Sequence, residues 1–292
     1  MKIIIGADGQ LGWELQRTAP AGIELVAIDI AELDVTKPEQ VNQFIEKEKP
    51  DWVINAAAYT AVDKAEDESE LAYRVNCDGA LNIAKACKKS GAKMLQVSTD
   101  FVFDGKQSTL YLTTSKPNPL SVYGASKQAG DEAVLKELGE QCTIVRTSWL
   151  YSAHGNNFVK TMLRLMPERS ELGIVADQIG TPTWANGLAR AIWSMLEKNV
   201  TGIQHWSDNG VASWYDFTVA IYEEGTAIGL IENDCNIKPI NSDQYPVQAE
   251  RPAYSVLDKN STVEKIEMEP REWRDALIKM LDDLENISDT VS

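Results

Sequence analysis

The first half of the chain alternates short β-rich runs with longer amphipathic stretches, and this alternation constrains the fold more than any other feature. The runs that predict strands are Lys2–Ile5, Glu24–Ile28, Trp52–Asn55, Lys93–Val97 and Thr143–Val145. The stretches that predict helices are Leu11–Thr18, Pro38–Lys47, Glu70–Ser90 and Ser121–Leu138. Such alternation favours a parallel sheet covered by helices on both faces. We therefore expect a doubly wound α/β fold.

The second half is less regular and predicts a smaller C-terminal α/β domain. Helices are expected near Asn157–Leu165, Pro182–Leu196, Ser213–Gly225 and Glu272–Leu284, and extended segments at Gly202–Trp206, Ile237–Pro239 and Tyr254–Leu257. We place one domain at residues 1–148 and the other mainly at 149–292, with segments of roughly 181–209 returning to the first. Residues 287–292 are expected to fray.

A glycine-rich turn, Gly6–Gly12, follows the first predicted strand and opens the first helix. Its glycines permit a tight turn and a close backbone approach, and a helix N-terminus attracts a pyrophosphate. The same turn could simply connect a strand to a helix. In this strand–helix context it favours a Rossmann-type dinucleotide site.

Acidic and small residues at the next strand ends support the same interpretation. Asp29 ends the second strand, where a carboxylate hydrogen-bonds a ribose hydroxyl and repels the additional phosphate of NADP. Its alternative is a plain loop carboxylate, and Asp34 is a weaker candidate for the adenine end. Ala56–Ala58 would let the backbone pack against a flat cofactor, although such a run also occurs for packing alone.

Tyr123 and Lys127 lie four residues apart on a predicted helix, so their side chains share one face. Such a pair often only covers a surface. Ser98 and Thr99 end the fourth strand, and strand alternation points their side chains to opposite faces. A hydroxyl from this strand end beside the Tyr and Lys would complete a proton-transfer site for carbonyl–alcohol redox chemistry.

Composition excludes several classes of protein. The 292 residues carry a formal net charge of −16, which disfavours nucleic-acid binding, since that requires a basic face. No apolar run approaches the roughly 20 residues that cross a bilayer, and no secretory signal is evident, so we expect a cytoplasmic protein with no membrane partner. The four scattered cysteines and two distant histidines do not predict a catalytic metal.

The chain resembles the extended short-chain dehydrogenase/reductases, and among them the dTDP-4-dehydrorhamnose reductase family. The stretches that carry the resemblance are Gly9–Arg17, Asn55–Asp63, Ser98–Gly105, Tyr123–Lys127, Arg146–Trp149, Asp177–Thr183 and Arg251–Pro252. They run in family order over most of the chain and thin out after about residue 258. Asn55–Asp63 and Ser98–Gly105 are far more specific than the glycine-rich turn.

The resemblance implies roles for these residues. Tyr123 would donate a proton to the substrate's carbonyl oxygen, Lys127 would lower the pKa of that phenol from about 10, and Thr99 would bind the same oxygen. The residues expected at NADH or NADPH are Gly6, Gly9, Gln10, Leu11, Gly12, Asp29, Ile30, Asp34, Val35, Ala56, Ala57, Ala58, Thr60, Ser98, Tyr123 and Lys127. Asp29 favours NADH.

The substrate that the resemblance implies is a dTDP-sugar. Trp149 resembles an aromatic residue that packs on the deoxysugar, and Arg251 could grip the diphosphate despite the acidic chain. A core Trp and a structural Arg are the alternatives. The residues expected at the substrate are Thr99, Phe101, Val62, Trp149, Phe158, Gln178 and Arg251.

One departure from the family concerns assembly. Some relatives bridge two subunits through magnesium held by glutamates; Glu14 is present here, but the second position is Asn186. We therefore do not expect a metal-bridged dimer, whereas a homodimer without metal is compatible with the pattern.

The function that the resemblance implies is reduction of the C4 ketone of dTDP-4-dehydro-6-deoxy-L-mannose to dTDP-L-rhamnose with NAD(P)H, a step of cell-surface polysaccharide biosynthesis. Two alternatives stay open. One is another nucleotide-sugar 4-keto reductase or epimerase, since the second half is rich in loops. The other is a cofactor-binding regulatory subunit, against which the retention of Thr99, Tyr123 and Lys127 counts.

Overall fold

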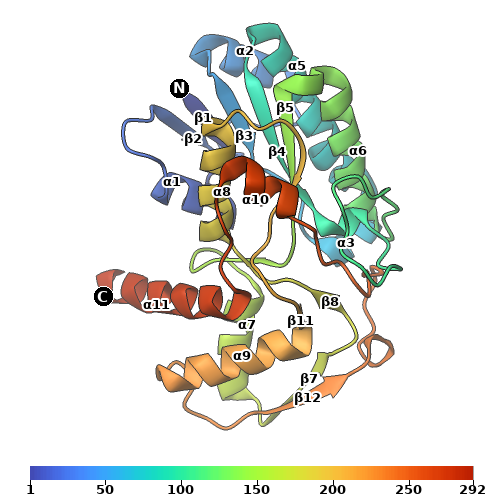
Figure 1. The fold of residues 1–292 in the computed structure, drawn as a ribbon, viewed down its shortest axis with the longest axis vertical. Helices are drawn as coiled ribbons and strands as arrows, with labels where there is room; N and C mark the ends of the chain where they lie inside the picture. Colours follow the sequence, from blue (N-terminus) through green and yellow to red (C-terminus); the bar gives the residue numbers. More distant parts are fainter. Residues whose placement is uncertain (292) are drawn as a thin grey trace.

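A six-stranded parallel sheet organises the first part of the computed structural model (Figure 1). The strand order is β10-β5-β4-β3-β1-β2, and neighbouring strands pair in parallel throughout. The strands are β1 (Lys2–Ile5), β2 (Leu25–Ile28), β3 (Trp52–Asn55), β4 (Lys93–Thr99), β5 (Cys142–Thr147) and β10 (Gly202–His205). The expected doubly wound α/β fold is confirmed.

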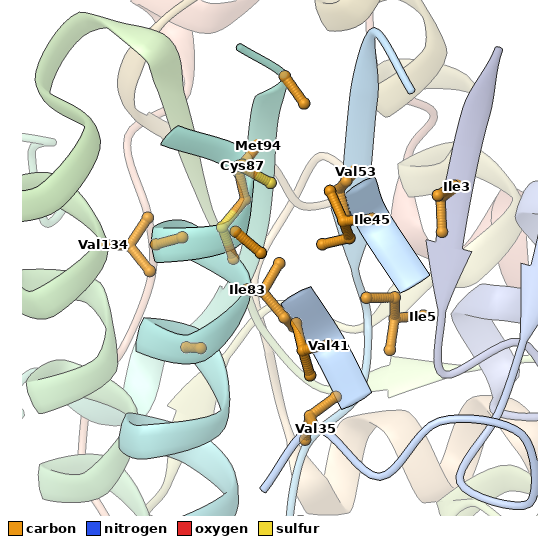
Figure 2. Packing of buried hydrophobic residues seen from close by; sticks show 14 of the residues in the cluster. Ile3, Ile5, Val35, Val41, Ile45, Val53, Ile83, Cys87, Met94 and Val134 are labelled. Carbon is orange, nitrogen blue, oxygen red and sulfur yellow. The ribbon is translucent and has the colours of Figure 1, made fainter. Parts of the chain in front are cut away.

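Both faces of the sheet are buried, because successive side chains of a strand point to opposite faces and both sets are apolar. Ile3 and Ile5 of β1 pack on the face covered by α2 (Pro38–Glu48), α5 (Ala80–Ser90) and α6 (Val122–Leu138). Figure 2 shows this cluster around Ile5, Val41 and Ile83. Ile4 points the other way, into a second core with α1 (Gln10–Arg17) and α8 (Ala185–Glu197).

Elements mainly from the second half of the chain form a smaller lobe below the carboxyl ends of the sheet strands (Figure 1). Its core joins α7, α9, α11, β7 and β12 through buried residues such as Met162, Phe217 and Leu277. Their bounds are α7 (Phe158–Leu165), β7 (Glu171–Val175), α9 (Trp214–Ala227), β12 (Asn236–Ile240) and α11 (Trp273–Val291). The short pairs β6 (Leu150–Tyr151) with β9 (Thr183–Trp184) and β8 (Ile179–Gly180) with β11 (Ala212–Ser213) lie beside it.

The chain order of the two parts is interleaved. After β8 and β9, α8 and β10 return to the six-stranded sheet before α9 re-enters the smaller lobe. The boundary between domains at residues 148 and 149 stays a prediction. The structure describes the backbone of residues 1–291 and the side chains of residues 1–286, so the expected fraying at residues 287–292 lies outside the described side chains.

Several local expectations need correction. Thr183 does not open a helix; it belongs to β9, and α8 begins at Ala185, because Thr183 N bonds Trp149 O and Trp184 N bonds the Asp208 carboxylate. The long helix expected at Glu70–Ser90 is divided into α4 (Ser69–Tyr73), a π-helical segment and α5. Strand β7 and the helices α3 (Val62–Asp67) and α10 (Asn260–Ile266) were not predicted.

Across the described part of the chain, every helix falls short of the length and apolarity that crossing a bilayer requires.

Close packing of α6 depends on Gly130. An added Cβ at Gly130 would lie 2.1 Å from the carbonyl oxygen of Asn76, in the π-helical segment Arg74–Gly79. We predict that Gly130→Ala destabilises the fold by about 1–3 kcal/mol in urea denaturation. This exceeds the roughly 1 kcal/mol that Ala gains over Gly as a helix former.

The control on the same helix is the exposed Lys136, whose replacement by Ala should change stability by no more than about 0.5 kcal/mol. Equal midpoints for wild type and Gly130→Ala would contradict the close contact between the two helices.

Candidate active site

A cleft of about 890 Å³ opens at the carboxyl ends of the sheet strands, where ligands bind in doubly wound folds. All the residues that the sequence assigned to the cofactor line this cleft: Gly6, Gly9, Gln10, Leu11, Gly12, Asp29, Ile30, Asp34, Val35, Ala56, Ala57, Ala58, Thr60, Ser98, Tyr123 and Lys127. Of the expected substrate residues, five line it too: Val62, Thr99, Phe101, Trp149 and Arg251. Phe158 and Gln178 lie outside the lining.

The turn between β1 and α1 approaches the neighbouring strand end too closely for any side chain. Gly6 has φ +87°, and an added Cβ there would lie 2.6 Å from Ala57 N. A Cβ at Gly12 would lie 2.1 Å from Gly6 O, whereas one at Gly9 meets nothing closer than 3.5 Å. Gly9 is also the N-cap of α1, whose first N–H groups have no partner within the helix. The turn therefore offers bare backbone donors to an anion.

Asp29 is fixed at the end of β2 by backbone donors. Its Oδ2 accepts from Asp8 N at 2.9 Å, and its Oδ1 accepts from Ile30 N at 2.7 Å. Each carboxylate oxygen keeps a further lone pair for a ribose hydroxyl. Asp8, Asp29 and Asp34 all line this end of the cleft, so its charge is negative.

The small residues Ala56–Ala58 follow β3 and are held by an amide pair below them. Asn55 Nδ2 donates to Gln96 Oε1 at 2.7 Å, and Asn55 Oδ1 accepts from Ala57 N at 3.2 Å. Both amide side chains are buried. The strand end is thus rigid and free of bulk where a flat ring would pass.

Helix α6 brings Tyr123 to the end of β4. Ser121 caps the helix by accepting from Gly124 N at 3.2 Å. A Cβ at Gly124 would lie 2.2 Å from Phe101 O, so only glycine allows this approach. The rings of Phe101 and Tyr123 meet edge to face at 5.7 Å. One turn further, Lys127 Nζ donates to Val97 O of β4 at 2.6 Å.

The Tyr123 phenol is protonated at neutral pH. Burial raises the pKa of Tyr123 to about 12; a hydrogen bond with Thr99 opposes this, and the charges of Asp100 and Asp131 add to it. Lys127 was expected to lower this pKa, but burial of the phenol outweighs the effect of the ammonium. Burial lowers the pKa of Lys127 itself, and its ammonium donates to Val97 O.

Thr99 sits between the phenol and a buried carboxylate that the sequence reasoning missed. Its hydroxyl donates to Asp100 Oδ1 at 3.1 Å and accepts from Phe101 N at 3.2 Å. Burial raises the pKa of Asp100 to about 6, and hydrogen bonds from Ser255 and Thr99 oppose the shift. In the sequence, Asp100 is marked by its position directly after Ser98 and Thr99, at the end of a predicted strand. Ser98 turns away, toward α6.

Aromatic side chains form the opposite wall. Trp149, which has φ +45°, stacks on Trp214 at 3.6 Å with 6° between the ring planes, and both line the cleft. Phe158 packs behind Trp214 at 4.6 Å. Gln178 instead donates to Ser242 Oγ at 3.0 Å. Trp214 was not predicted, because a helix-opening Trp is more often a core residue.

Arg251 reaches the cleft already paired. Its Nη1 and Nη2 donate to the two carboxylate oxygens of Asp63 at 3.2 and 2.7 Å, and Nη1 also donates to Ala249 O. This contact ties the loop at 249–251 to α3. The Arg251 guanidinium is therefore already in an ion pair before any substrate binds, and is not a free cation.

Glu14 does not fit a role as a surface metal ligand. It is fully buried and accepts from Arg17, from Ser152 Oγ at 3.1 Å and from Asn186 Nδ2 at 2.8 Å. Within the described residues no group of three His, Cys, Asp or Glu side chains is arranged to hold a metal ion.

The family model for the RmlD substrate binding domain matches residues 1–286. The chain is 42% identical over 283 residues to a dTDP-4-dehydrorhamnose reductase of Aggregatibacter actinomycetemcomitans, covering 94% of this chain and 96% of that protein. The chain belongs to the dTDP-4-dehydrorhamnose reductase family. The resemblance on which the sequence analysis relied is thereby confirmed.

Solved structures of the family agree. The crystal structure of a dTDP-4-dehydrorhamnose reductase from Clostridium acetobutylicum has a TM-score of 0.91 and 41% identity, covering 98% of this chain and 100% of that chain. The enzyme from Bacillus anthracis, solved in complex with NADP, has a TM-score of 0.91 and 38% identity, covering 97% and 98%. In this family member the turn Gly6–Gly12, called the glycine cradle below, lines the cleft with the bare backbone that suits a dinucleotide.

We predict different effects for two glycines of the cradle. Gly12→Ala should lower both stability and NADH affinity, because its Cβ collides with Gly6 O. Gly9→Ala should fold with a stability loss below about 1 kcal/mol, since its φ of −72° suits alanine. It should still bind NADH more weakly, because the methyl group obstructs the backbone approach. Fluorescence titration with NADH and urea denaturation measure the two effects, and unchanged affinity in Gly9→Ala would contradict this role.

Proposed function

We propose that this family member reduces the C4 ketone of dTDP-4-dehydro-6-deoxy-L-mannose to dTDP-L-rhamnose with NAD(P)H. The observation that carries the proposal is the convergence of Thr99, Tyr123 and Lys127 in the cleft that begins at the glycine cradle. When bound, the nicotinamide supplies the hydride. The chain's own residues must then orient the ketone and deliver one proton to its oxygen.

Tyr123 is the proton donor in this proposal. Its pKa of about 12 keeps the phenol protonated through the neutral range, so it can serve as a general acid without prior activation. Thr99 shares a hydrogen bond with the phenol and is held by Asp100 and the Phe101 amide. That geometry fixes the point at which the carbonyl oxygen must sit to meet both hydroxyl groups.

Lys127 serves the phenol after the proton has left. A phenolate buried in this cleft is costly, and an ammonium group one helical turn away lowers that cost. The hydrogen bond to Val97 O holds the ammonium at this depth. Trp149 and Trp214 supply a flat apolar surface that suits a pyranose face bearing a methyl group.

We predict that Tyr123→Phe lowers turnover of the keto-sugar nucleotide by about 10²- to 10⁴-fold, because the proton donor is lost. The assay follows loss of nicotinamide absorbance. NADH affinity should change little, since the ring that contacts Phe101 stays in place. Tyr222→Phe is the control, because Tyr222 Oη meets Asp234 outside the cleft at 3.4 Å and should leave turnover unchanged.

A panel of dTDP-, UDP- and GDP-linked keto sugars separates this function from its alternatives. Turnover restricted to the dTDP compound supports the proposal. Preference for another base or sugar favours a related nucleotide-sugar reductase or epimerase. Tight cofactor binding without turnover of any compound favours a regulatory subunit.

We propose further that NADH is the preferred cofactor. A 2′-phosphate would approach the carboxylates of Asp8, Asp29 and Asp34. The cations within the described lining already have partners: Lys127 donates to Val97 O, and Arg251 is paired with Asp63. At about 4 Å in water, each pair of like charges costs on the order of 1 kcal/mol.

Asp29→Asn should therefore raise the ratio of kcat/KM for NADPH to that for NADH by about tenfold, since about 1.4 kcal/mol of repulsion is removed. The matched control is Asp234→Asn, the same change outside the cleft. A strong NADPH preference in the wild-type protein would remove this role for Asp29. The cytoplasmic location and the homodimer stay predictions.

A further inference from the structure

A third ionisable residue continues the Tyr123–Lys127 row on α6. Asp131 lies four residues beyond Lys127, as Lys127 lies four beyond Tyr123, so all three share one helix face. Lys127 is 3% exposed and Asp131 only 1%.

The charges of two buried cations, Lys127 and Arg146, act on Asp131. Its Oδ2 accepts from Ser98 Oγ at 2.5 Å and lies 3.8 Å from Arg146 Nε, a separation too long for a hydrogen bond but short enough for an ion pair. Arg146 itself is 2% exposed, and its guanidinium lies over the Phe103 ring. Asp131 Oδ1 has no hydrogen-bond partner among the described residues.

Asp131 and the ionisable groups around it shift one another's pKa values. Burial raises the pKa of Asp131 to about 6, the charges of Lys127 and Arg146 and the Ser98 hydrogen bond oppose this, and Glu132 adds to it. In return, the Asp131 charge raises the pKa of Lys127, Tyr123, Arg146 and Cys142. For Lys127, Asp131 is the one effect that opposes desolvation.

We propose that Asp131 is a positioning residue of the reductase, whose charge keeps the proton on Lys127 and so sets the upper pH limit of the Tyr123–Lys127 pair. The proposal rests on the function proposed above for that pair. Without the Asp131 carboxylate, the buried cations Lys127 and Arg146 would lose the negative charge that acts on both of them. A buried ammonium in that position releases its proton more readily.

The sign of the effect is the same for both members of the pair. Neutralising Asp131 lowers the pKa of Lys127 and also the pKa of Tyr123, because a negative charge favours the protonated form of each. Reduction of a ketone needs the proton on Tyr123 and the charge on Lys127. If either the Tyr123 proton or the Lys127 charge is lost at a lower pH, the alkaline fall of kcat moves to a lower pH.

A purely structural role predicts something else. Ser98–Asp131 joins β4 to α6, so its loss could loosen the helix and lower the amount of active protein. That would reduce activity at every pH by the same factor and leave the pH of the alkaline fall where it was. The position of the fall separates the two roles, because it does not depend on the fraction of protein folded.

The kinetic test compares Asp131→Asn with Asp131→Glu. We expect the alkaline fall of kcat to move down by about one pH unit or more in Asp131→Asn, as for loss of an opposite charge nearby. Asp131→Glu restores the charge and should return the fall toward its wild-type position. Asp208→Asn is the matched control, since Asp208 is also buried but caps Trp184 N and should not move the fall. Coincident falls in wild type and Asp131→Asn overturn the proposal.

A second readout needs neither substrate nor cofactor. In protein labelled with ¹³C at aspartate carboxyl groups, the Asp131 resonance, assigned by its loss in Asp131→Asn or Asp131→Glu, should titrate near pH 6. Lys127→Met should raise that pKa, because coupling between two charges is reciprocal. An unchanged titration in Lys127→Met overturns the coupling, even if Asp131→Asn fails to fold. If the two pKa values are coupled but the wild type turns over no keto sugar, the interaction of Asp131 with Lys127 stands and the proposed reaction is refuted.

Discussion

The candidate site depends on how closely α6 lies against the end of β4. Two contacts set that distance: Gly124 against Phe101 O, just after β4, and Lys127 Nζ donating to Val97 O of β4; Gly130 against Asn76 O sets the approach of α6 to the π-helical segment beside it. Two glycines remove the side chains that would hold the helix away, and the lysine binds a carbonyl that the strand end leaves available. Without that separation, Tyr123 would not reach Thr99. The reactive geometry is therefore a consequence of packing between two regular elements, and no mobile loop is needed to create it.

Much of this arrangement follows from sequence pattern because the constraint is local. Five strands and four helices of the first half could be placed by period and by flanking glycines, and the carboxyl ends of parallel strands must then share one edge. Strand-end pattern placed Gly6, Asp29 and Ala57 at one cleft and the family resemblance added Tyr123, and all four line the cleft of the structure. Pairing between segments far apart in the sequence could not be predicted in the same way. β7 pairs with β12 across about sixty residues, and β7 lacks the alternation of apolar and polar residues that would predict a strand.

The charge states of the site could not be predicted from spacing. A Lys four residues after a Tyr suggested a lowered phenol pKa, yet burial dominates and raises it to about 12. Burial depends on neighbours such as Phe101, which the helix sequence does not contain. The same holds for Trp214: its importance comes from the 3.6 Å stack on Trp149, a contact between segments far apart in the sequence.

Both cations of the described cleft lining are already neutralised, which changes how an acidic chain can hold anionic ligands. Arg251 is paired with Asp63, and Lys127 lies beside Asp131 beneath the site. With a formal net charge of −16, long-range attraction does not favour a dinucleotide or a sugar nucleotide. Binding must instead rely on short-range backbone donors, such as the first N–H groups of α1 beyond Gly9. Such dipoles act over one helical turn, where salt screens little. A cleft of this kind selects its ligand by fit to fixed donors, so Lys127 need not bind an anion and can serve the proton on Tyr123.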